Sequence, residues 1–147
     1  MAQQVVDVHY AKSDQYRNMI TKIAKVGKCP FCPKHFKHHR KKILQKEGAW
    51  FITENSWPYR ETRWHLLIIG ITHKERLSEL TPGDMANILK LLQWAERRFK
   101  IPGGGFAMRF GQTRYTGATV CHLHAHLIVP KLNRKTGRAK VVSFPVG

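Results

Sequence analysis

The stretch from Val120 to Val129, VCHLHAHLIV, alternates between two kinds of side chain and is the most informative part of the chain. An alternation with a period of two predicts a β-strand, whose successive side chains point to opposite faces of a sheet. His122, His124 and His126 then share one face, with neighbouring imidazoles about 7 Å apart along the strand. The other face, with Cys121 as a buried thiol, packs into the core. Three adjacent imidazoles add nothing to packing, which indicates metal binding or acid–base and nucleophilic chemistry.

The segments around this strand predict an α+β fold, in which a mainly antiparallel five-stranded sheet carries one long helix and an N-terminal helix. An apolar stripe at helical spacing predicts the N-terminal helix over 14–26, with Ser13 or Asp14 as its cap and Gly27 at its end. The long helix begins after a cap at Thr81 and ends in a basic turn near residue 100. Its expected buried stripe is Met85, Ile88, Leu89, Leu92 and Ala95. Strands are expected at 43–45, 49–53, 64–69, 106–110 and 120–129, with a short edge strand at 141–144.

Length and composition limit the class of protein. A chain of 147 residues fits a single domain, 1–147, and its longest apolar run, Leu66–Ile69, is far below the roughly 20 residues of a membrane span. The beginning of the chain has no secretory pattern, so we expect a soluble cytoplasmic protein with no membrane partner. An odd number of cysteines, three, argues against a disulfide framework.

The charge is unusual. Lys and Arg number 26 against nine Asp and Glu, a formal net charge of +17. Such an excess favours phosphate-bearing partners: nucleotides, nucleic acid or anionic lipid. The segments 34–46 and 131–140 hold much of it and suit a nucleic-acid backbone, with a solvated basic surface as the alternative.

The histidine stretch resembles a known family. Residues His122–Ile128, HLHAHLI, match at every position the pattern His-φ-His-φ-His-φ-φ (φ, apolar) of the histidine triad (HIT) superfamily of nucleotide hydrolases and transferases. The segment Trp64–His73, WHLLIIGITH, is similar to an earlier family segment, and Cys29-x-x-Cys32 is similar to that of zinc-containing members. The resemblance covers residues 28–130. It implies a HIT-like fold and a homodimer, for which the long helix and the strand at Gly103–Phe110 are candidate contact surfaces.

The resemblance also implies a chemistry. His124, as a neutral imidazole, attacks the α-phosphorus of a nucleotide and forms a covalent nucleotidyl-histidine, which water hydrolyses to a nucleoside monophosphate. His126 donates to the phosphate or the leaving group, and His65 completes the polar cluster. Uridylyltransferase relatives often carry glutamine in place of the third histidine, so His126 favours a hydrolase. Dinucleoside polyphosphates and nucleotide phosphoramidates are the expected substrates.

The chain departs from the family just before the histidines. Members usually carry Gly-Gln-Ser or Gly-Gln-Thr where this chain has Gly117–Val120, GATV, so that Ala118 replaces a glutamine and Thr119 keeps the hydroxyl. An asparagine expected further upstream is also absent. We expect the substrate phosphate to be contacted by polar residues of this region: Gln112, Thr113, Arg114 and Thr119.

Cys29 and Cys32 supply half of a tetrahedral zinc site. By the resemblance, His73 and His122 complete a structural zinc site. Two alternatives stay open, namely that no metal binds or that nearby histidines complete a local site. Those histidines are His35, His38 and His39.

Two other functions are compatible with the sequence. An aprataxin-like enzyme would remove adenylate from nucleic-acid 5′ ends, using the basic segments. A non-catalytic zinc-containing module would bind nucleic acid, with Trp57 and Tyr59 of the 55–62 loop stacking on bases. Trp50 and Trp64 are expected to pack in the core instead.

Overall fold

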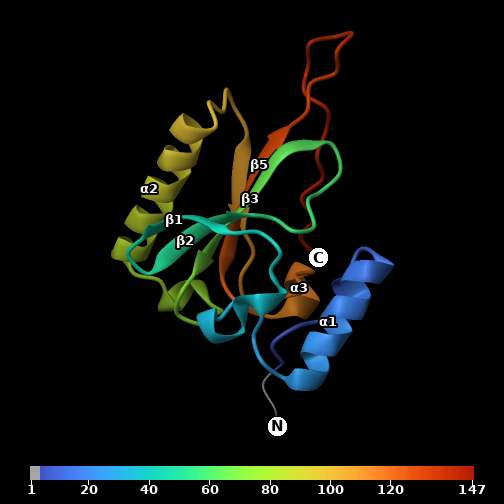
Figure 1. The fold of residues 1–147 in the computed structure, drawn as a ribbon, viewed down its shortest axis with the longest axis vertical. Helices are drawn as coiled ribbons and strands as arrows, with labels where there is room; N and C mark the ends of the chain where they lie inside the picture. Colours follow the sequence, from blue (N-terminus) through green and yellow to red (C-terminus); the bar gives the residue numbers. More distant parts are fainter. Residues whose placement is uncertain (1–3) are drawn as a thin grey trace.

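The computed structural model describes residues 4–147, which form one antiparallel sheet with helices on both sides (Figure 1). The strand order is β1-β2-β3-β5-β4. The strands are β1 (Ile43–Glu47), β2 (Trp50–Glu54), β3 (Thr62–Gly70), β4 (Gly105–Met108) and β5 (His124–Pro130). The α-helices are α1 (Asp14–Val26), α2 (Pro82–Arg98) and α3 (Thr113–Thr116), and 3-10 turns lie at Val8–Tyr10, Pro33–His38 and Leu77–Glu79. The predicted α+β class and five-stranded antiparallel sheet are confirmed.

Helix α2 covers one face of the sheet and closes the main core (Figure 1). Thr81 and Asp84 form a reciprocal capping box at its start, as the sequence predicts for the cap. The Asp84 carboxylate also accepts hydrogen bonds from Trp50 Nε1 and Lys74 Nζ, both at 2.8 Å, and so ties the helix to β2. The core is apolar: Trp50, Ile52, Leu66, Ile68, Ile88, Leu91, Ala95, Leu123, Ala125 and Leu127.

The predicted buried stripe of α2 is partly wrong. Met85 and Leu89 are 46% and 53% exposed, and Leu91 is buried instead. The hydrogen bonds of Asp84 to Trp50 and Lys74 turn its side of the helix toward the sheet. The residues four, seven and eleven positions later lie on the same side and are therefore buried, namely Ile88, Leu91 and Ala95. A prediction from apolar spacing ignores the buried carboxylate of Asp84, so it assigned burial to a neighbouring face of the helix.

Helix α1 has the predicted bounds and lies on the other side of the sheet from α2 (Figure 1). Ser13 Oγ accepts from the Tyr16 amide, and Gly27, at φ 67°, ends the helix in the left-handed region. Ile20 and Ile23 pack into a second, smaller cluster with Val6, Cys29 and Val120. This cluster brings the N-terminal helix beside the segment that leads into β5.

The end of the chain differs from the prediction in two places. Strand β5 begins only at His124, because Val120 pairs with Val6 and the chain bends before the strand. Cys121 lies in this bend and is half-buried, so its prediction as a core thiol is wrong. Residues 141–144 form no strand, and Phe144 packs against Tyr59 and His126.

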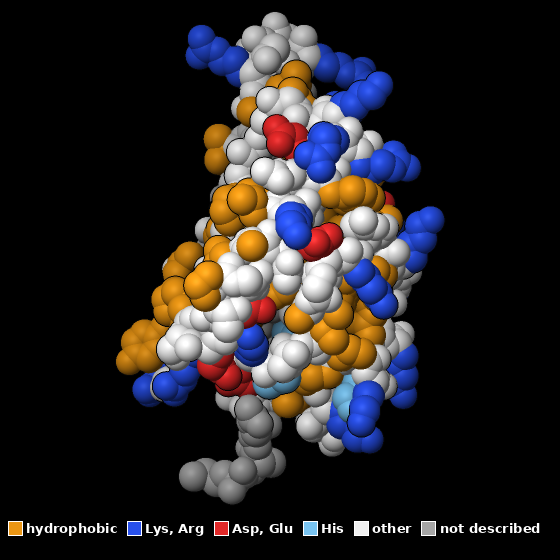
Figure 2. Space-filling view, turned by 90° about the vertical axis from the view of Figure 1, so that its left-hand side faces the viewer, with side chains coloured by type: hydrophobic (Ala, Val, Ile, Leu, Met, Phe, Trp, Pro, Cys, Tyr) orange, Lys and Arg blue, Asp and Glu red, His pale blue; other side chains and the backbone are white. Residues whose placement is uncertain are grey.

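A loop at 131–140 protrudes from the body of the protein (Figure 1). A bridge between Leu132 and Ala139 closes its base. Lys and Arg side chains surround this end of the molecule (Figure 2), and the loop contributes Lys131, Arg134, Lys135, Arg138 and Lys140. Within residues 4–147, none of the helices combines the length and hydropathy required to cross a bilayer.

Candidate functional site

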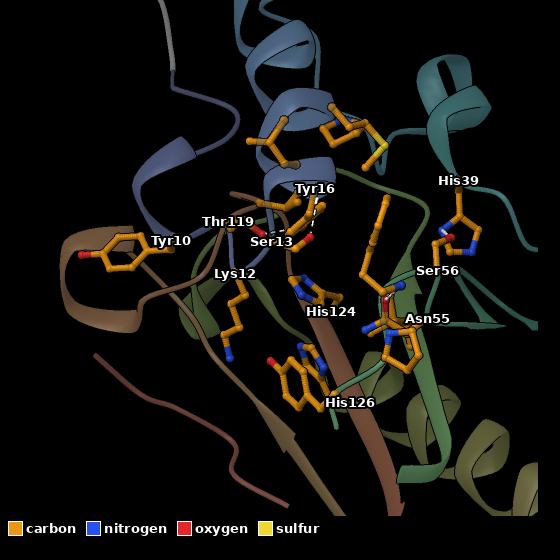
Figure 3. A pocket seen from close by; sticks show the side chains of 18 of the residues that line it. Tyr10, Lys12, Ser13, Tyr16, His39, Asn55, Ser56, Thr119, His124 and His126 are labelled. Atoms are coloured by element: carbon orange, nitrogen blue, oxygen red, sulfur yellow. Dashed lines mark hydrogen bonds between the residues drawn. The ribbon is translucent and has the colours of Figure 1, made fainter. Parts of the chain in front are cut away.

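Strands β3 and β5 place three histidines on the sheet face opposite α2. Their antiparallel register pairs Leu67 with His126 and Ile69 with His124, and His65 lies two residues before Leu67. The intervening residues of both strands face α2, so the period of two directs the three imidazoles to the other side. There they are buried against a cavity of about 830 Å³, of which His124 and His126 line the wall (Figure 3).

A chain of hydrogen bonds fixes the proton positions on His65 and His126. The Tyr59 amide donates to His65 Nδ1 at 3.0 Å, so the proton of neutral His65 is on Nε2. His65 Nε2 then donates to His126 Nδ1 at 2.8 Å, which places the His126 proton on Nε2. His126 Nε2 is buried and has no partner within residues 4–147. A buried N–H without a partner is a donor available to a ligand oxygen.

His124 has the opposite arrangement. Its Nδ1 donates to the His122 carbonyl oxygen at 2.6 Å, so Nε2 carries the lone pair. Burial lowers the pKa of His124 to about 3 and the pKa of His65 to about 4, so both imidazoles are neutral near pH 7. A neutral imidazole with a fixed tautomer and an available lone pair is a nucleophile.

Segments from both ends of the chain complete the cavity. From α1 the apolar face contributes Tyr16, Met19, Ile20 and Ile23. The β2–β3 loop contributes Trp57 and Tyr59, and the Tyr16 and Trp57 rings lie 5.5 Å apart. Thr119 also lines the cavity, and its hydroxyl is hydrogen-bonded to the Tyr16 hydroxyl (Figure 3). Of the four residues predicted to contact substrate, Thr119 alone lines the cavity.

The other three lie elsewhere. Gln112, Thr113 and Arg114 line a second groove, together with Asp7 and Cys121. Thr113 Oγ1 donates to Asp7 Oδ2 at 2.8 Å, and Arg114 Nε donates to Gln112 Oε1 at 2.7 Å. Glycines at positive φ bracket α3, namely Gly111 and Gly117, and turn this segment away from the histidines. The structure therefore does not bring these three side chains together with His124.

Three cations that the sequence did not predict as site residues line the cavity in their place, namely Lys12, Arg60 and Arg109. Lys12 precedes α1, in a segment outside the family resemblance, and Arg109 directly follows β4. The position of Arg109, at the end of the strand paired with β5, was the only signal in the sequence that could have indicated it.

A second cluster forms beside the histidine cavity from Cys29, Cys32, His73 and His122, whose ligand atoms all lie within 4.8 Å of one another. Cys29 Sγ is 3.4 Å from His122 Nδ1, Cys32 Sγ is 3.5 Å from His73 Nδ1, and the two Nδ1 atoms are 3.2 Å apart. Tetrahedral zinc, with bonds of about 2.0–2.1 Å to nitrogen and 2.3 Å to sulfur, separates its ligand atoms by roughly 3.3–3.8 Å. The donor set and its spacing therefore fit zinc.

The outer nitrogens of this cluster are also arranged as in a metal site. His122 Nε2 donates to the Gly70 carbonyl at 2.7 Å, and His73 Nε2 is 2.9 Å from Glu75 Oε1. The Nδ1 atoms of His73 and His122 then direct their lone pairs at each other. A cation between them would accept both lone pairs and remove this repulsion. Burial raises the pKa of the Cys29 thiol to about 12, so a thiolate there also requires a cation.

The local alternative for this metal site does not form. Among residues 4–147, the grouping of metal-ligand side chains is the long-range one. His39 instead bonds to Thr53 Oγ1 at 2.8 Å and to Ser56 Oγ at 3.3 Å.

Comparisons with known proteins agree with this fold. The chain superimposes on the histidine triad nucleotide-binding protein from Candida albicans with a TM-score of 0.60 and 20% identity, covering 82% of this chain and 85% of that one. A zinc-bound histidine triad family protein from Mycobacterium smegmatis gives 0.54 and 23%, covering 75% and 79%. The diadenosine triphosphate hydrolase from Plasmodium falciparum gives 0.50 and 19%, covering 62% of each chain.

At these identities the solved structures establish the fold alone. Among curated protein sequences, none matches the chain. The model of the HIT domain matches residues 37–133, which is more than half of the chain and includes both strands that carry the cavity histidines. The protein is therefore a member of the HIT domain family.

Proposed function

We propose that the protein is a nucleotide hydrolase that cleaves a phosphoanhydride or phosphoramidate bond at the α-phosphate and releases a nucleoside monophosphate. The main support for this proposal is that two histidines on one cavity wall present complementary nitrogens, one an acceptor and the other a donor. His124 offers a lone pair on Nε2, and His126 offers an unpartnered N–H on Nε2. Membership in the HIT domain family and the likeness to a diadenosine triphosphate hydrolase support it.

In the first step, His124 Nε2 attacks the α-phosphorus and forms a P–N bond. The bond from phosphorus to the leaving group breaks, and its electron pair departs with the leaving atom. A phosphate leaves as its stable anion, whereas an amine takes a proton from water. The His126 Nε2–H donates to a phosphoryl oxygen, where negative charge gathers, and His65 keeps that proton in place through its bond to Nδ1.

In the second step, a water molecule attacks the phosphorus of the nucleotidyl-histidine. The P–N bond breaks and its electron pair returns to His124 Nε2, while the water releases one proton to solvent. The bond from His124 Nδ1 to the His122 carbonyl persists through both steps, so the nucleophile returns in the correct tautomer. Because burial lowers the pKa of His124 to about 3, the free enzyme is not inactivated by protonation near neutral pH.

We further propose a structural role for zinc at the Cys29, Cys32, His73 and His122 cluster. When bound, zinc would hold the segment between the cysteines to the sheet. Phe31 lies in that segment, and its ring is 6.0 Å from the ring of His122 and 5.0 Å from that of His124. The metal site would thereby fix an apolar wall against the nucleophile without contacting the substrate.

A homodimer is the proposed assembly. Strand β4 is an edge of the sheet, and Phe106 on it is 58% exposed. The exposed Met85 and Leu89 on α2 add apolar surface of the kind that a second copy would cover.

Nucleic-acid 5′ ends are a second candidate substrate, favoured by one observation. The basic 131–140 loop is anchored to the rim of the cavity, because the Lys131 amide donates to the Glu61 carbonyl at 2.8 Å and Lys140 Nζ lies 3.0 Å from Glu61 Oε2. Glu61 itself lines the cavity. A nucleic-acid strand that lay along the loop would therefore have its 5′ end near the histidines.

The test is chromatographic analysis of nucleotide products from the full-length protein. The panel is a diadenosine polyphosphate, an adenosine phosphoramidate, its guanosine counterpart and a 5′-adenylated DNA. His124→Ala is the test variant, and His9→Ala, which removes an exposed imidazole that is not among the cavity-lining residues, is its control.

We expect monophosphate release by the wild type and His9→Ala but not by His124→Ala. Mass spectrometry of quenched wild-type enzyme would then detect a nucleotidyl adduct on His124. Identical behaviour of wild type and His124→Ala on every substrate would contradict the proposal. Salt-sensitive binding of DNA in that case would favour the non-catalytic zinc module.

A further inference from the structure

Two cations converge at the His126 end of the cavity. Lys12 extends from the segment before α1 toward His126 (Figure 3), and its Nζ lies 4.3 Å from the centre of the Tyr59 ring. Arg109 Nη2 donates to the Tyr59 hydroxyl at 3.3 Å. The Tyr59 ring in turn stacks 5.8 Å from the His126 ring and lies 4.5 Å from that of His65. Both cations are thus arranged around one aromatic ring beside the catalytic cluster.

Neither cation is neutralised by the protein. Within residues 4–147, no carboxylate forms an ion pair with Lys12 or Arg109, and the carboxylate that lines the cavity, Glu61, pairs with Lys140. Arg109 Nε is also buried without a hydrogen-bond partner among the residues that the structure describes. Burial lowers the pKa of Lys12, and the nearby charge of Arg109 lowers it further. Two unpaired positive charges with an unused donor attract an anion.

The two ends of the cavity differ in character. The α1 face and Trp57 form an apolar, aromatic wall that suits a nucleoside. Both cations contact Tyr59, whose ring packs against those of His65 and His126, and among residues 4–147 no ring contact joins Tyr59 to His124. The cations therefore lie at the His126 end of the cavity.

We propose that Lys12 and Arg109 form a binding site for a phosphate group on the leaving side of the scissile bond, so that the preferred substrate has a phosphorylated leaving group. This inference rests on the proposed function and specifies its substrate class. An oligophosphate chain and the 5′-phosphate of a nucleic acid share this chemistry, whereas a neutral amine does not. Arg109 lies within residues 37–133, whereas Lys12 lies outside them, so half of the site comes from outside the segment that the HIT domain model matches.

The C-terminal segment positions one of the two cations. Arg109 Nη1 donates to the Pro145 carbonyl at 3.1 Å, and its guanidinium lies 4.9 Å above the Phe144 ring. The Phe144 ring also packs 5.1 Å from that of His126. These contacts hold the guanidinium beside His126, and Arg109 Nε has no hydrogen-bond partner in the described part of the chain.

The experiment compares substrates that share an AMP moiety and differ in the leaving group. Values of kcat/KM are measured for adenosine phosphoramidate, diadenosine tetraphosphate and 5′-adenylated DNA. The variants are Lys12→Gln and Arg109→Lys, and the matched control is Lys22→Gln, which removes an exposed lysine of α1. Lys12 makes no hydrogen bond to the protein among the described residues, so Lys12→Gln is expected to fold normally, as circular dichroism and thermal unfolding would verify.

We expect Lys12→Gln to lower kcat/KM about 10-fold or more for the two substrates with phosphate leaving groups, and about twofold or less for the phosphoramidate. Arg109→Lys should give a smaller loss with the same selectivity, and Lys22→Gln none. A loss on diadenosine tetraphosphate alone would assign the site to oligophosphate, and a loss on adenylated DNA alone would assign it to nucleic-acid ends; either supports the proposal.

An equal loss on all three substrates, or no loss on any, would overturn it while leaving the proposed hydrolase intact. Failure of the wild type to release AMP from any of the three would instead remove the proposed function, and this inference with it.

Discussion

His122 and His124 are two residues apart, yet they belong to clusters with opposite properties. In the metal cluster, the outer nitrogens of His73 and His122 are bonded to Glu75 and Gly70, and the inner nitrogens converge on one point with two sulfurs. In the cavity cluster, which consists of His65, His124 and His126, the Nε2 atoms of His124 and His126 have no hydrogen-bond partner among residues 4–147. The use of each ring nitrogen, rather than the residue type, therefore distinguishes the proposed metal ligands from the proposed nucleophile.

The backbone produces this separation. The chain bends at His122 and enters β5 only at His124, so the two side chains are carried by different local structures. His122 donates to the carbonyl of Gly70, the last residue of β3, whereas His124 lies opposite Ile69 within the sheet. The carbonyl of His122 is in turn the acceptor that fixes the tautomer of His124. One residue thus serves the metal cluster with its side chain and the cavity cluster with its backbone.

The largest effect is expected from His124→Ala. Because this change removes the proposed nucleophile, turnover should fall on the order of 10⁴-fold or more. Zinc content should be unchanged, because the His124 side chain is not part of the metal cluster. Monophosphate release and metal analysis on the same sample would test both statements. Loss of zinc together with activity would show that the two clusters are not separable.

The converse change is Cys29→Ser, with Cys121→Ser as the matched control for a thiol outside the cluster. Cys29→Ser should lose bound zinc and lower the free energy of unfolding by about 3 kcal/mol or more, because metal binding to the folded state contributes to folding. Cys121→Ser should retain zinc. Denaturant unfolding with and without a chelator measures both. A chelator that leaves the stability of the wild type unchanged would contradict the structural role of zinc.

The buried histidines of the cavity cluster should make the free energy of unfolding depend on pH. Burial lowers the pKa of His65 to about 4 in the folded protein, against about 6.5 in the unfolded chain. Between these values the unfolded state binds more protons, so stability is complete above about pH 6.5 and is lost as the pH falls toward 4, by about 1.4 kcal/mol per pH unit for each such histidine. His65→Gln should lose less stability than the wild type between pH 6.5 and 5, by about 2 kcal/mol. Parallel pH curves from urea unfolding would show that His65 is not buried as a neutral imidazole.

The sequence predicted the fold because its strongest patterns are local. The bounds of α1 follow from one apolar stripe, with Ser13 and Gly27 at its ends, and the five-stranded sheet follows from alternation and turns. The grouping of Cys29 and Cys32 with two distant histidines came from the family resemblance, since spacing alone also allowed a local site.

What the sequence did not predict depends on contacts between distant segments. Met85 and Leu89 were expected to be buried but are exposed. The spacing of apolar residues does not indicate that Asp84 is hydrogen-bonded to Trp50 and Lys74, which sets the orientation of the helix. Lys12 lines the cavity because α1 packs against the segment before β5, a contact between distant parts of the sequence. Such arrangements require the tertiary structure.

The smallest effect concerns the outer nitrogens of the metal cluster. Glu75→Gln keeps the shape of the side chain but removes the carboxylate that holds His73 Nε2 at 2.9 Å. Removal of such a partner weakens metal binding by about 10-fold, because a carboxylate orients the imidazole and increases its basicity. Competition with a chromogenic chelator measures this change, while kcat at saturating zinc should equal that of the wild type, since Glu75 lies outside the histidine cavity. Unchanged zinc affinity would mean that convergence of the four inner ligand atoms suffices, and a fall in kcat would mean that the order of the metal cluster reaches His124 through Phe31.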